Sequence, residues 1–327
     1  KANMRVEGAH RIGELIGQAM RIATTGAPGP VHLELNGYTG AVLADDTAGI
    51  ALPDPRYVIT PAIRQSAPAQ DVEAALKALA TTVRPIIVAG SGIRQSQATE
   101  ALRAFAHHLR IPVATSLDAK GALQESDPLL TGCVGTYSRE TANKAVAEAD
   151  FVTFVGTSTS NMVTANWRLP KPGIRAIQID VDPRELGRNY PLEAGLAGDP
   201  ATVLDQLRAA APAQPDRSAW LDRIKALKDD WKATLQSDEY SDAVPIRPER
   251  LCRDLSDVLP ENAVLLVDTG HAAHWACRHI HLDKPGQTVL RPAGSLGWSY
   301  PASLGAKCGV PNRPVGWFTG GGGFLSL

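Results

Sequence analysis

Residues 85–109 read PIIVAGSGIRQSQATEALRAFAHHL, and this stretch decides the fold class. It opens with a short, continuous apolar run that ends in a glycine-bearing turn at residues 90–92, as expected for a strand buried on both faces. It closes with apolar side chains at helical spacing, so that Leu102, Phe105 and Leu109 share one face. A buried strand followed by an amphipathic helix predicts the repeating unit of a parallel α/β fold.

The same alternation of strand and helix runs along the whole chain. Continuous β-branched runs predict strands at Val31–Leu35, Ile86–Ala89, Pro112–Thr115, Phe151–Val155, Ala176–Asp180, Val264–Asp268 and Val315–Thr319. Apolar periodicity predicts helices over residues 72–79, 102–109, 203–207 and 220–235. Asp199 and Pro200 suit the N-cap and first position of the third helix. The predicted fold class is therefore α/β, with doubly wound parallel sheets.

Two proline-containing stretches without periodicity divide the chain into units. We expect a complete α/β domain at the centre of the chain, flanked by two partial domains. The predicted organisation is a partial domain at 1–41, a linker at 42–69, the central domain at 70–212, a helix and linker at 213–249, and a second partial domain at 250–327. Because the chain opens without Met and stops after a strand-like run, we expect both ends to be cut.

The composition excludes several classes of protein. Lys and Arg total 33 against 34 Asp and Glu, a formal net charge of −1, so the basic excess of a nucleic-acid-binding protein is missing. Apolar residues make up 44% of the chain, which favours a buried core over disorder. No run approaches the roughly 18 apolar residues of a membrane helix, and no secretory signal is visible. We expect a cytoplasmic protein with no membrane or nucleic-acid partner.

The four cysteines are far apart in the sequence and form no CxxC pair; they are Cys133, Cys252, Cys277 and Cys308. This spacing disfavours a disulfide scaffold and a cysteine-rich zinc site. His271 and His274 are three residues apart and suit one helix face, but zinc needs a third and a fourth ligand. Packing or solvated roles are favoured for His274, His279 and His281.

Glycine-bearing corners gather in the last third of the chain. They are Asp268, Gly270 and His271 after one predicted strand, Gly294, Ser295, Leu296 and Gly297 before a predicted helix, and Gly320, Gly321, Gly322, Gly323 and Phe324 after another strand. Glycine loops at the carboxyl ends of parallel strands bind phosphates, because free backbone N–H groups point at the anion. They are also common as plain turns, and the pattern alone leaves both interpretations open.

The order of these pieces resembles the thiamine diphosphate-dependent enzymes of the acetolactate synthase and 2-keto acid decarboxylase superfamily. Residues 27–35 look like the end of that family's pyrimidine-binding domain. Residues 85–92, 111–121, 155–157, 177–183 and 198–199 look like its central domain, and residues 268–324 resemble the start of its diphosphate-binding domain. The resemblance implies a lyase or carboligase that acts on a small 2-keto acid with thiamine diphosphate and Mg²⁺. Because the family builds its active sites between protomers, it also implies a homo-dimer or homo-tetramer.

The resemblance assigns roles to individual residues. The turn Asp268–His271 would help to hold the cofactor diphosphate. The carbonyl of Ser295 would meet the aminopyrimidine, and Leu296 would wedge between the two rings and bend the cofactor. This bend would bring the exocyclic nitrogen near the thiazolium C2, so that the cofactor could remove its own C2 proton. The resulting carbanion would attack the keto acid, and the thiazolium would accept the electron pair released when CO₂ leaves. Catalysis then depends more on orientation than on side-chain acids and bases.

Two departures from the family pattern stand out. Gly321 occupies the position of an aspartate that ligates Mg²⁺, so no metal-ligating residue is assigned in this chain. The family's second metal ligand lies downstream of Leu327, and its activating glutamate lies upstream of this chain, so no catalytic residue is assigned either. We therefore expect a chain that is incomplete for catalysis, or a non-catalytic assembly homologue.

The central domain offers another possibility, a module that binds FAD or ADP. Relatives that bind FAD often carry an arginine after the strand that matches Phe151–Val155, and residues 156–160 contain none. Asp180 and Asp182 end a predicted strand, where an acidic side chain can hold a ribose hydroxyl or simply cap the next turn. The turn at 90–92 is not a full dinucleotide fingerprint, because Gln95 stands at the third glycine position.

Overall fold

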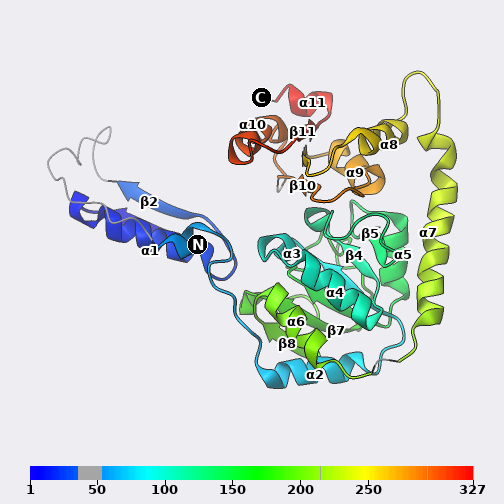
Figure 1. Cartoon of the computed structure of the whole chain (residues 1–327), viewed down its shortest axis with the longest axis horizontal. Helices are drawn as coiled ribbons and strands as arrows, with labels where there is room; N and C mark the ends of the chain where they lie inside the picture. The colour runs from blue at the N-terminus through cyan, green and yellow to red at the C-terminus, as the bar shows by residue number, and fades with distance from the viewer. Residues whose placement is uncertain (36–53, 214, 293, 327) are drawn as a thin grey trace.

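The computed structural model describes residues 1–35, 54–213, 215–292 and 294–326 (Figure 1). Along the chain lie an N-terminal unit (residues 1–35), a central unit (residues 69–210), a long helix α7 (Ser218–Glu239) and a C-terminal unit (residues 248–326). Figure 1 shows the N-terminal unit projecting to one side, while the C-terminal unit lies against the central unit. Within the described ranges, no helix is long and apolar enough to cross a membrane.

A six-stranded parallel sheet forms the middle of the central unit, in the order β5-β4-β3-β6-β7-β8. The strands are β3 (Pro85–Ala89), β4 (Val113–Thr115), β5 (Leu130–Cys133), β6 (Phe151–Val155), β7 (Arg175–Asp180) and β8 (Ala194–Ala197). Strands β4 and β5 are added on one side of β3, and strands β6, β7 and β8 are then added on the other side. This reversal places a topological switch point between β3 and β6, at their carboxyl ends.

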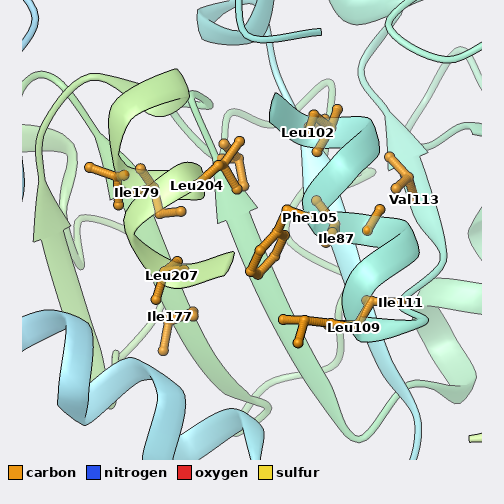
Figure 2. Packing of buried hydrophobic residues seen from close by; sticks show 14 of the residues in the cluster. Ile87, Leu102, Phe105, Leu109, Ile111, Val113, Ile177, Ile179, Leu204 and Leu207 are labelled. Atoms are coloured by element: carbon orange, nitrogen blue, oxygen red, sulfur yellow. The ribbon is translucent and has the colours of Figure 1, made fainter. Parts of the chain in front are cut away.

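Helices cover both faces of this sheet because alternate strand residues point in opposite directions. In β3, Ile87 and Ala89 pack under α2 (Ala69–Leu79), α4 (Thr99–Leu109) and α6 (Pro200–Ala210). Ile86 and Val88 instead belong to the core under α5 (Glu140–Glu148) and α7. Figure 2 shows the first layer, where Phe105 lies among leucines and isoleucines from helices and strands. Each such fully buried side chain contributes about 2 kcal/mol.

Local sequence explains why α6 begins at Pro200. The Asp199 carboxylate accepts a hydrogen bond from the backbone N–H of Thr202 at 3.2 Å, which is the N-cap interaction expected from the sequence. The same carboxylate accepts hydrogen bonds from the Arg64 guanidinium at 2.7 Å and from the Ser96 hydroxyl at 2.6 Å. Asp199 therefore fixes the start of α6 against the turn that follows β3.

A buried arginine joins the ends of two helices. Arg217 is 1% exposed and donates to the carbonyl oxygens of Leu79, in α2, and Leu109, in α4. Its charge complements the carbonyl ends of both helices. Burial lowers the pKa of Arg217, with a smaller opposing effect from Asp150. This contact fastens α2 and α4 together just before α7 starts.

The N-terminal unit consists of one parallel strand pair and a helix. Strands β1 (Ala2–Val6) and β2 (Val31–Leu35) pair in parallel, and α1 (Ile12–Thr24) follows a short 3₁₀ turn, η1 (Ala9–Arg11). A second 3₁₀ turn, η3 (Pro55–Val58), contacts α1. The backbone N–H of Ala62 donates to the Thr24 carbonyl at 3.4 Å, which connects this unit to the segment entering the central unit.

The C-terminal unit has a three-stranded parallel sheet in the order β10-β9-β11. Its elements are α8 (Pro248–Val258), β9 (Val264–Val267), α9 (His271–His279), β10 (Thr288–Leu290), α10 (Ser299–Gly309), β11 (Val315–Phe318) and α11 (Gly321–Phe324). Its core is continuous with the central unit, because Leu117 and Cys133 pack into the same cluster as Leu265 and Ala276.

The predicted fold class is confirmed: the architecture is α/β with parallel sheets, and the central sheet is covered on both faces. All seven predicted strands are present, to within a residue or two at their ends. The four predicted helices lie within α2, α4, α6 and α7. The sequence missed β1, β5, β8 and β10, the helices α5 and α8, and short elements that include α3 (Gly92–Gln95), η4 (Leu117–Ala119) and η5 (Pro183–Glu185). The predicted domain limits remain predictions, and residues 42–53 of the expected linker lie outside the described residues.

Candidate functional site

One buried carboxylate joins the three glycine-bearing corners of the C-terminal unit. Asp268 follows β9 and is 1% exposed. Its Oδ1 accepts hydrogen bonds from the backbone N–H groups of Thr269, at 2.7 Å, and Gly297, at 3.1 Å. Its Oδ2 accepts from the hydroxyls of Ser299, at 3.1 Å, and Thr319, at 3.0 Å. The corners at 268–271, 294–299 and 319–323 therefore meet at a single side chain.

Two glycines let these corners approach each other closely. A Cβ atom at Gly323 would lie 2.5 Å from Thr319 Oγ1 and 2.8 Å from Asp268 Oδ2. Gly297 has a φ of +81°, and a Cβ there would lie 3.2 Å from the Gly323 carbonyl oxygen. Only glycine fits both places without moving the backbone. Gly297 and Gly323 thus serve the packing of the corners against each other.

The remaining glycines of the three corners border open space. A Cβ atom would meet nothing within 4 Å at these positions, which are Gly270, Gly294, Gly320, Gly321 and Gly322. Gly270 and Gly294 also have positive φ values, of +86° and +114°. Because these glycines lie beside Asp268 and have no side chain, a ligand has room to approach their main-chain atoms directly.

The other predicted site residues lie around this joint with exposed side chains. His271, Ser295, Leu296 and Phe324 are all exposed, and half of the Leu296 side chain, 52%, is accessible to solvent. Phe324 contacts the Tyr300 ring edge-on, with the ring centroids 6.2 Å apart. These four side chains flank the joint and make no hydrogen bond to Asp268.

The run of four glycines differs from the expected loop. Gly320 precedes a short helix, α11, and Gly321, Gly322 and Gly323 lie inside it. The backbone N–H groups of Phe324 and Leu325 donate to the carbonyls of Gly320 and Gly321, each at 3.0 Å. Glycine has a low helix propensity, but Gly323 is anchored between Thr319 and Asp268, which holds this turn in place.

The sequence pattern did not single out two hydroxyls of the site. Ser299 is fully buried at the start of α10, and Thr319 follows β11. Both donate to Asp268, as described above. A buried aspartate that ends a strand needs donors in the neighbouring corners, and this requirement is the signal that would have found them.

The donor set does not suit a hard divalent cation. Mg²⁺ requires oxygen ligands with free lone pairs, whereas Gly321 has no side-chain oxygen and the Asp268 carboxylate already accepts four hydrogen bonds. Across the part of the chain that the structure describes, no group of three or more His, Cys, Asp or Glu side chains is arranged to hold a metal ion. The described residues therefore fit a diphosphate better than they fit its metal.

A second crevice lies at the switch point of the central sheet. It has a volume of about 190 Å³ and borders Ser91, Gly92, Asp180 and Asp182. Burial raises the pKa of Asp180 to about 6, despite a hydrogen bond from the backbone N–H of Asp182. The glycines beside the crevice serve packing, since a Cβ atom at Gly92 would lie 2.6 Å from the Cα atom of Gly156.

The backbone N–H groups at this switch point are already in use. Gly90 N–H donates to the Val155 carbonyl and Gly92 N–H donates to the Gly156 carbonyl, each at 2.9 Å. They are therefore not free to bind a phosphate as the N–H groups of a dinucleotide-binding turn would be. A nucleotide there would need other donors and acceptors, such as the side chains that border the crevice.

Comparison with known families matches two parts of the chain. The model described as "Thiamine pyrophosphate enzyme, central domain" matches residues 72–207. The model described as "Thiamine pyrophosphate enzyme, C-terminal TPP binding domain" matches residues 268–327. The second match begins at Asp268, the residue on which the glycine corners converge.

Individual relatives agree with these matches. A probable acetolactate synthase large subunit from Methanocaldococcus jannaschii is 35% identical over 339 aligned residues, covering 99% of this chain and 56% of that protein. The acetolactate synthase large subunit of Corynebacterium glutamicum is 30% identical, covering 100% of this chain and 52% of that protein. The chain thus spans about half the length of the curated relatives it matches. From these matches and the parallel α/β architecture, the chain belongs to the thiamine pyrophosphate enzyme family and is acetolactate synthase-like.

Proposed function

We propose that the three corners around Asp268 bind the diphosphate of thiamine diphosphate, in an enzyme that acts on a small 2-keto acid. The observation that carries this proposal is the joint itself, where one buried carboxylate fastens three corners whose outer glycines face open space. Family membership supports the cofactor assignment. When bound, thiamine diphosphate supplies a nucleophilic carbon and an electron sink for reactions of keto acids.

The chain's own residues would contribute binding and orientation. The backbone at Gly270, Gly294 and Gly320 is open enough for phosphate oxygens to approach. The exposed apolar side chain of Leu296 is placed to contact an apolar ring beside the joint. Asp268 itself would act as a positioning residue, since all its hydrogen bonds go to the corners. Rigid positioning of this kind lowers the entropic cost of reaching a reactive geometry.

We propose dependence on Mg²⁺ only for a protein that carries a carboxylate at position 321. Mg²⁺ would lack side-chain ligands here, because Gly321 has no side-chain oxygen and the Asp268 carboxylate already accepts four hydrogen bonds. The glycine at position 321 favours a chain that is incomplete for turnover by itself, or a non-catalytic assembly homologue, over an enzyme that is active on its own. Assembly as a homo-dimer or homo-tetramer and a cytoplasmic location are also part of the proposal.

Titration calorimetry with thiamine diphosphate, and separately with inorganic pyrophosphate, tests the site. Gly321→Val places a side chain in space that no protein atom occupies, so the fold is kept and the ligand is obstructed. We expect binding at least about tenfold weaker, or about 1.4 kcal/mol. Gly305→Val is the matched control, because Gly305 is also exposed and unobstructed but lies in α10. Equal affinities for wild type and Gly321→Val would reject the assignment.

The crevice at the switch point favours a second candidate function, binding of FAD or ADP. Asp180 ends β7 and Asp182 caps the turn that follows, beside a cavity of about 190 Å³ where a carboxylate can accept hydrogen bonds from ribose hydroxyls. A yellow preparation of the protein that absorbs at about 450 nm would support bound flavin. If the preparation is colourless and FAD gives no heat on titration, this candidate fails, while the diphosphate site is unaffected.

A further inference from the structure

Two thiols that are distant in the sequence meet between the central and C-terminal units. Cys133 ends β5 and Cys277 lies in α9, and they are 1% and 0% exposed. The two side chains are within hydrogen-bond reach of each other, and neither is in a disulfide. The Cys277 thiol also donates to the Tyr137 carbonyl at 2.8 Å. Sequence separation had disfavoured a disulfide, but the fold brings this pair together.

The surroundings make the two thiols chemically different. The neighbouring Cys277 side chain lowers the pKa of Cys133, with help from Lys120, Thr115 and Arg139 and against the effect of burial. Burial and the neighbouring Cys133 raise the pKa of Cys277. Thiolates are the nucleophilic form of cysteine. Cys133 is therefore placed to react first, with a protonated thiol beside it.

A small cavity reaches Cys133 from the side of Lys120. It has a volume of about 10 Å³ and is lined by residues that include Lys120, Glu125 and Cys133. This is room for about one water molecule. It shares Lys120 and Leu282 with a cavity of about 460 Å³, which extends to exposed Arg103. The two cavities are separated only by side chains that line both, so a small oxidant needs less movement of the protein to reach Cys133 than a bulky one does.

We propose that Cys133 and Cys277 are a peroxide-reactive pair, in which hydrogen peroxide oxidises Cys133 and Cys277 then closes a disulfide between the central and C-terminal units. The inference stands on the thiol contact, the cavity in front of Cys133 and the cations of Lys120 and Arg139 beside it. It does not depend on the diphosphate site.

The two steps balance with hydrogen peroxide as the oxidant. The Cys133 thiolate attacks one peroxide oxygen, the O–O bond breaks, and the departing hydroxide takes up the proton that the thiol had lost and leaves as water. The Cys277 thiol then attacks the sulfur of the resulting sulfenic acid. A second hydroxide departs and takes up the Cys277 proton as water, and two electrons have passed from the two sulfurs to the peroxide.

Mass spectrometry of the folded chain tests the pair in a Cys308→Ser background, because Cys308 is exposed and would react in any case. After brief treatment with hydrogen peroxide, we expect a mass decrease of about 2 Da and a cross-linked peptide containing Cys133 and Cys277. Glutathione disulfide should react at least about tenfold more slowly, since it does not fit the cavity. If both thiols persist after peroxide treatment, the proposal is wrong.

Cys252 provides the matched control within the same core. It is 0% exposed in α8, but burial raises its pKa to about 12 and no thiol lies beside it among its described partners. Cys252→Ser should leave the disulfide unaffected. Cys277→Ser should stop the reaction at a sulfenic acid on Cys133, which dimedone traps. Oxidation of Cys252 at the same rate as Cys133 would mean that peroxide enters through unfolding, which would overturn the proposal.

Discussion

The Oδ2 atom of Asp268 lies 3.0 Å from the Thr319 hydroxyl, so a side-chain hydrogen bond joins the carboxyl ends of β9 and β11 in addition to their backbone pairing. The two strands are neighbours in the sheet, and their ends carry two of the three glycine corners. The third corner joins through the N–H of Gly297 on the other carboxylate oxygen. The site is therefore organised by a single buried side chain, and changes around it should have separable effects.

Asp268→Ala should destabilise the chain by about 3 kcal/mol. The substitution leaves buried donors, such as the Ser299 hydroxyl, without an acceptor. Urea unfolding followed by circular dichroism measures the change in the free energy of unfolding. Asp257→Ala is the control, because Asp257 is exposed at the end of α8, and it should cost less than about 0.5 kcal/mol. Equal stability of the two variants would show that the hydrogen bonds of Asp268 do not contribute to the free energy of unfolding.

Gly323→Ala should weaken both stability and thiamine diphosphate binding, whereas Gly322→Ala should leave stability unchanged. The added methyl group at Gly323 would lie 2.5 Å from Thr319 Oγ1, so the corner must shift. At Gly322 the same methyl group meets no protein atom. Calorimetric affinity and thermal midpoint, measured on both variants, separate the two positions. Identical behaviour would contradict the packing role assigned to Gly323.

Gly321→Asp should raise the affinity for thiamine diphosphate in the presence of millimolar Mg²⁺. The position has no steric obstruction and no positive φ, so an aspartate fits. Unlike the valine of Gly321→Val, it adds the missing oxygen ligand, and the attraction of the bound Mg²⁺ for the diphosphate should outweigh the space that the side chain takes. An increase of at least about tenfold is expected, and chelation of the metal should abolish it. Gly321→Ala fills the same space without an oxygen and should show no increase. Unchanged calorimetric affinity of Gly321→Asp would place the metal elsewhere.

Glu125→Gln should destabilise the chain by about 3 kcal/mol at neutral pH. Burial opposes ionisation of Glu125, but the Arg139 guanidinium and Lys120 hold the pKa of this carboxyl far below its usual range. A depressed pKa contributes stability above the unfolded value of about 4.3, and that stability is lost as the pH falls. The difference from wild type should therefore shrink below about pH 5 in urea titrations. Glu100→Gln, at an exposed site, should show no such dependence.

His279→Phe should make the chain less sensitive to acid. Burial lowers the pKa of His279 to about 3, with help from Arg278 and Arg139. The unfolded chain therefore binds a proton below about pH 6.5 that the folded chain excludes, and the wild type loses about 2 kcal/mol by pH 5. Unfolding free energies at pH 7 and pH 5 test this, with exposed His108→Asn as the control. An unchanged pH slope in His279→Phe would contradict it.

Most of the strands that the sequence revealed are continuous runs of apolar residues, such as β3 and β6. Phe151–Val155 is buried at every position and was predicted with its observed limits. The missed strand β5 contains Gly132 with a φ of +104°, and β8 reads Ala-Gly-Leu-Ala, so neither carries the β-branched signal. Their pairing partners supply the stability that their own propensity lacks.

The candidate site divides in the same way. Local sequence marked the corners, because a glycine after a strand is visible along the chain. It could not mark Ser299 as a partner of Asp268, nor Cys277 as a neighbour of Cys133, because these contacts exist only once the sheets have formed. Contacts between residues distant along the chain depend on topology, which single-residue patterns do not encode.

The apolar cluster that contains both Leu117 and Leu265 has a consequence for how this molecule comes apart. Neither the central unit nor the C-terminal unit can leave the other without exposing that cluster to water. Heat or urea should then unfold the two units together in one cooperative transition. Cleavage of the chain near residue 245 and separation of the two fragments would expose the apolar cluster on both, so both should aggregate and be poorly soluble.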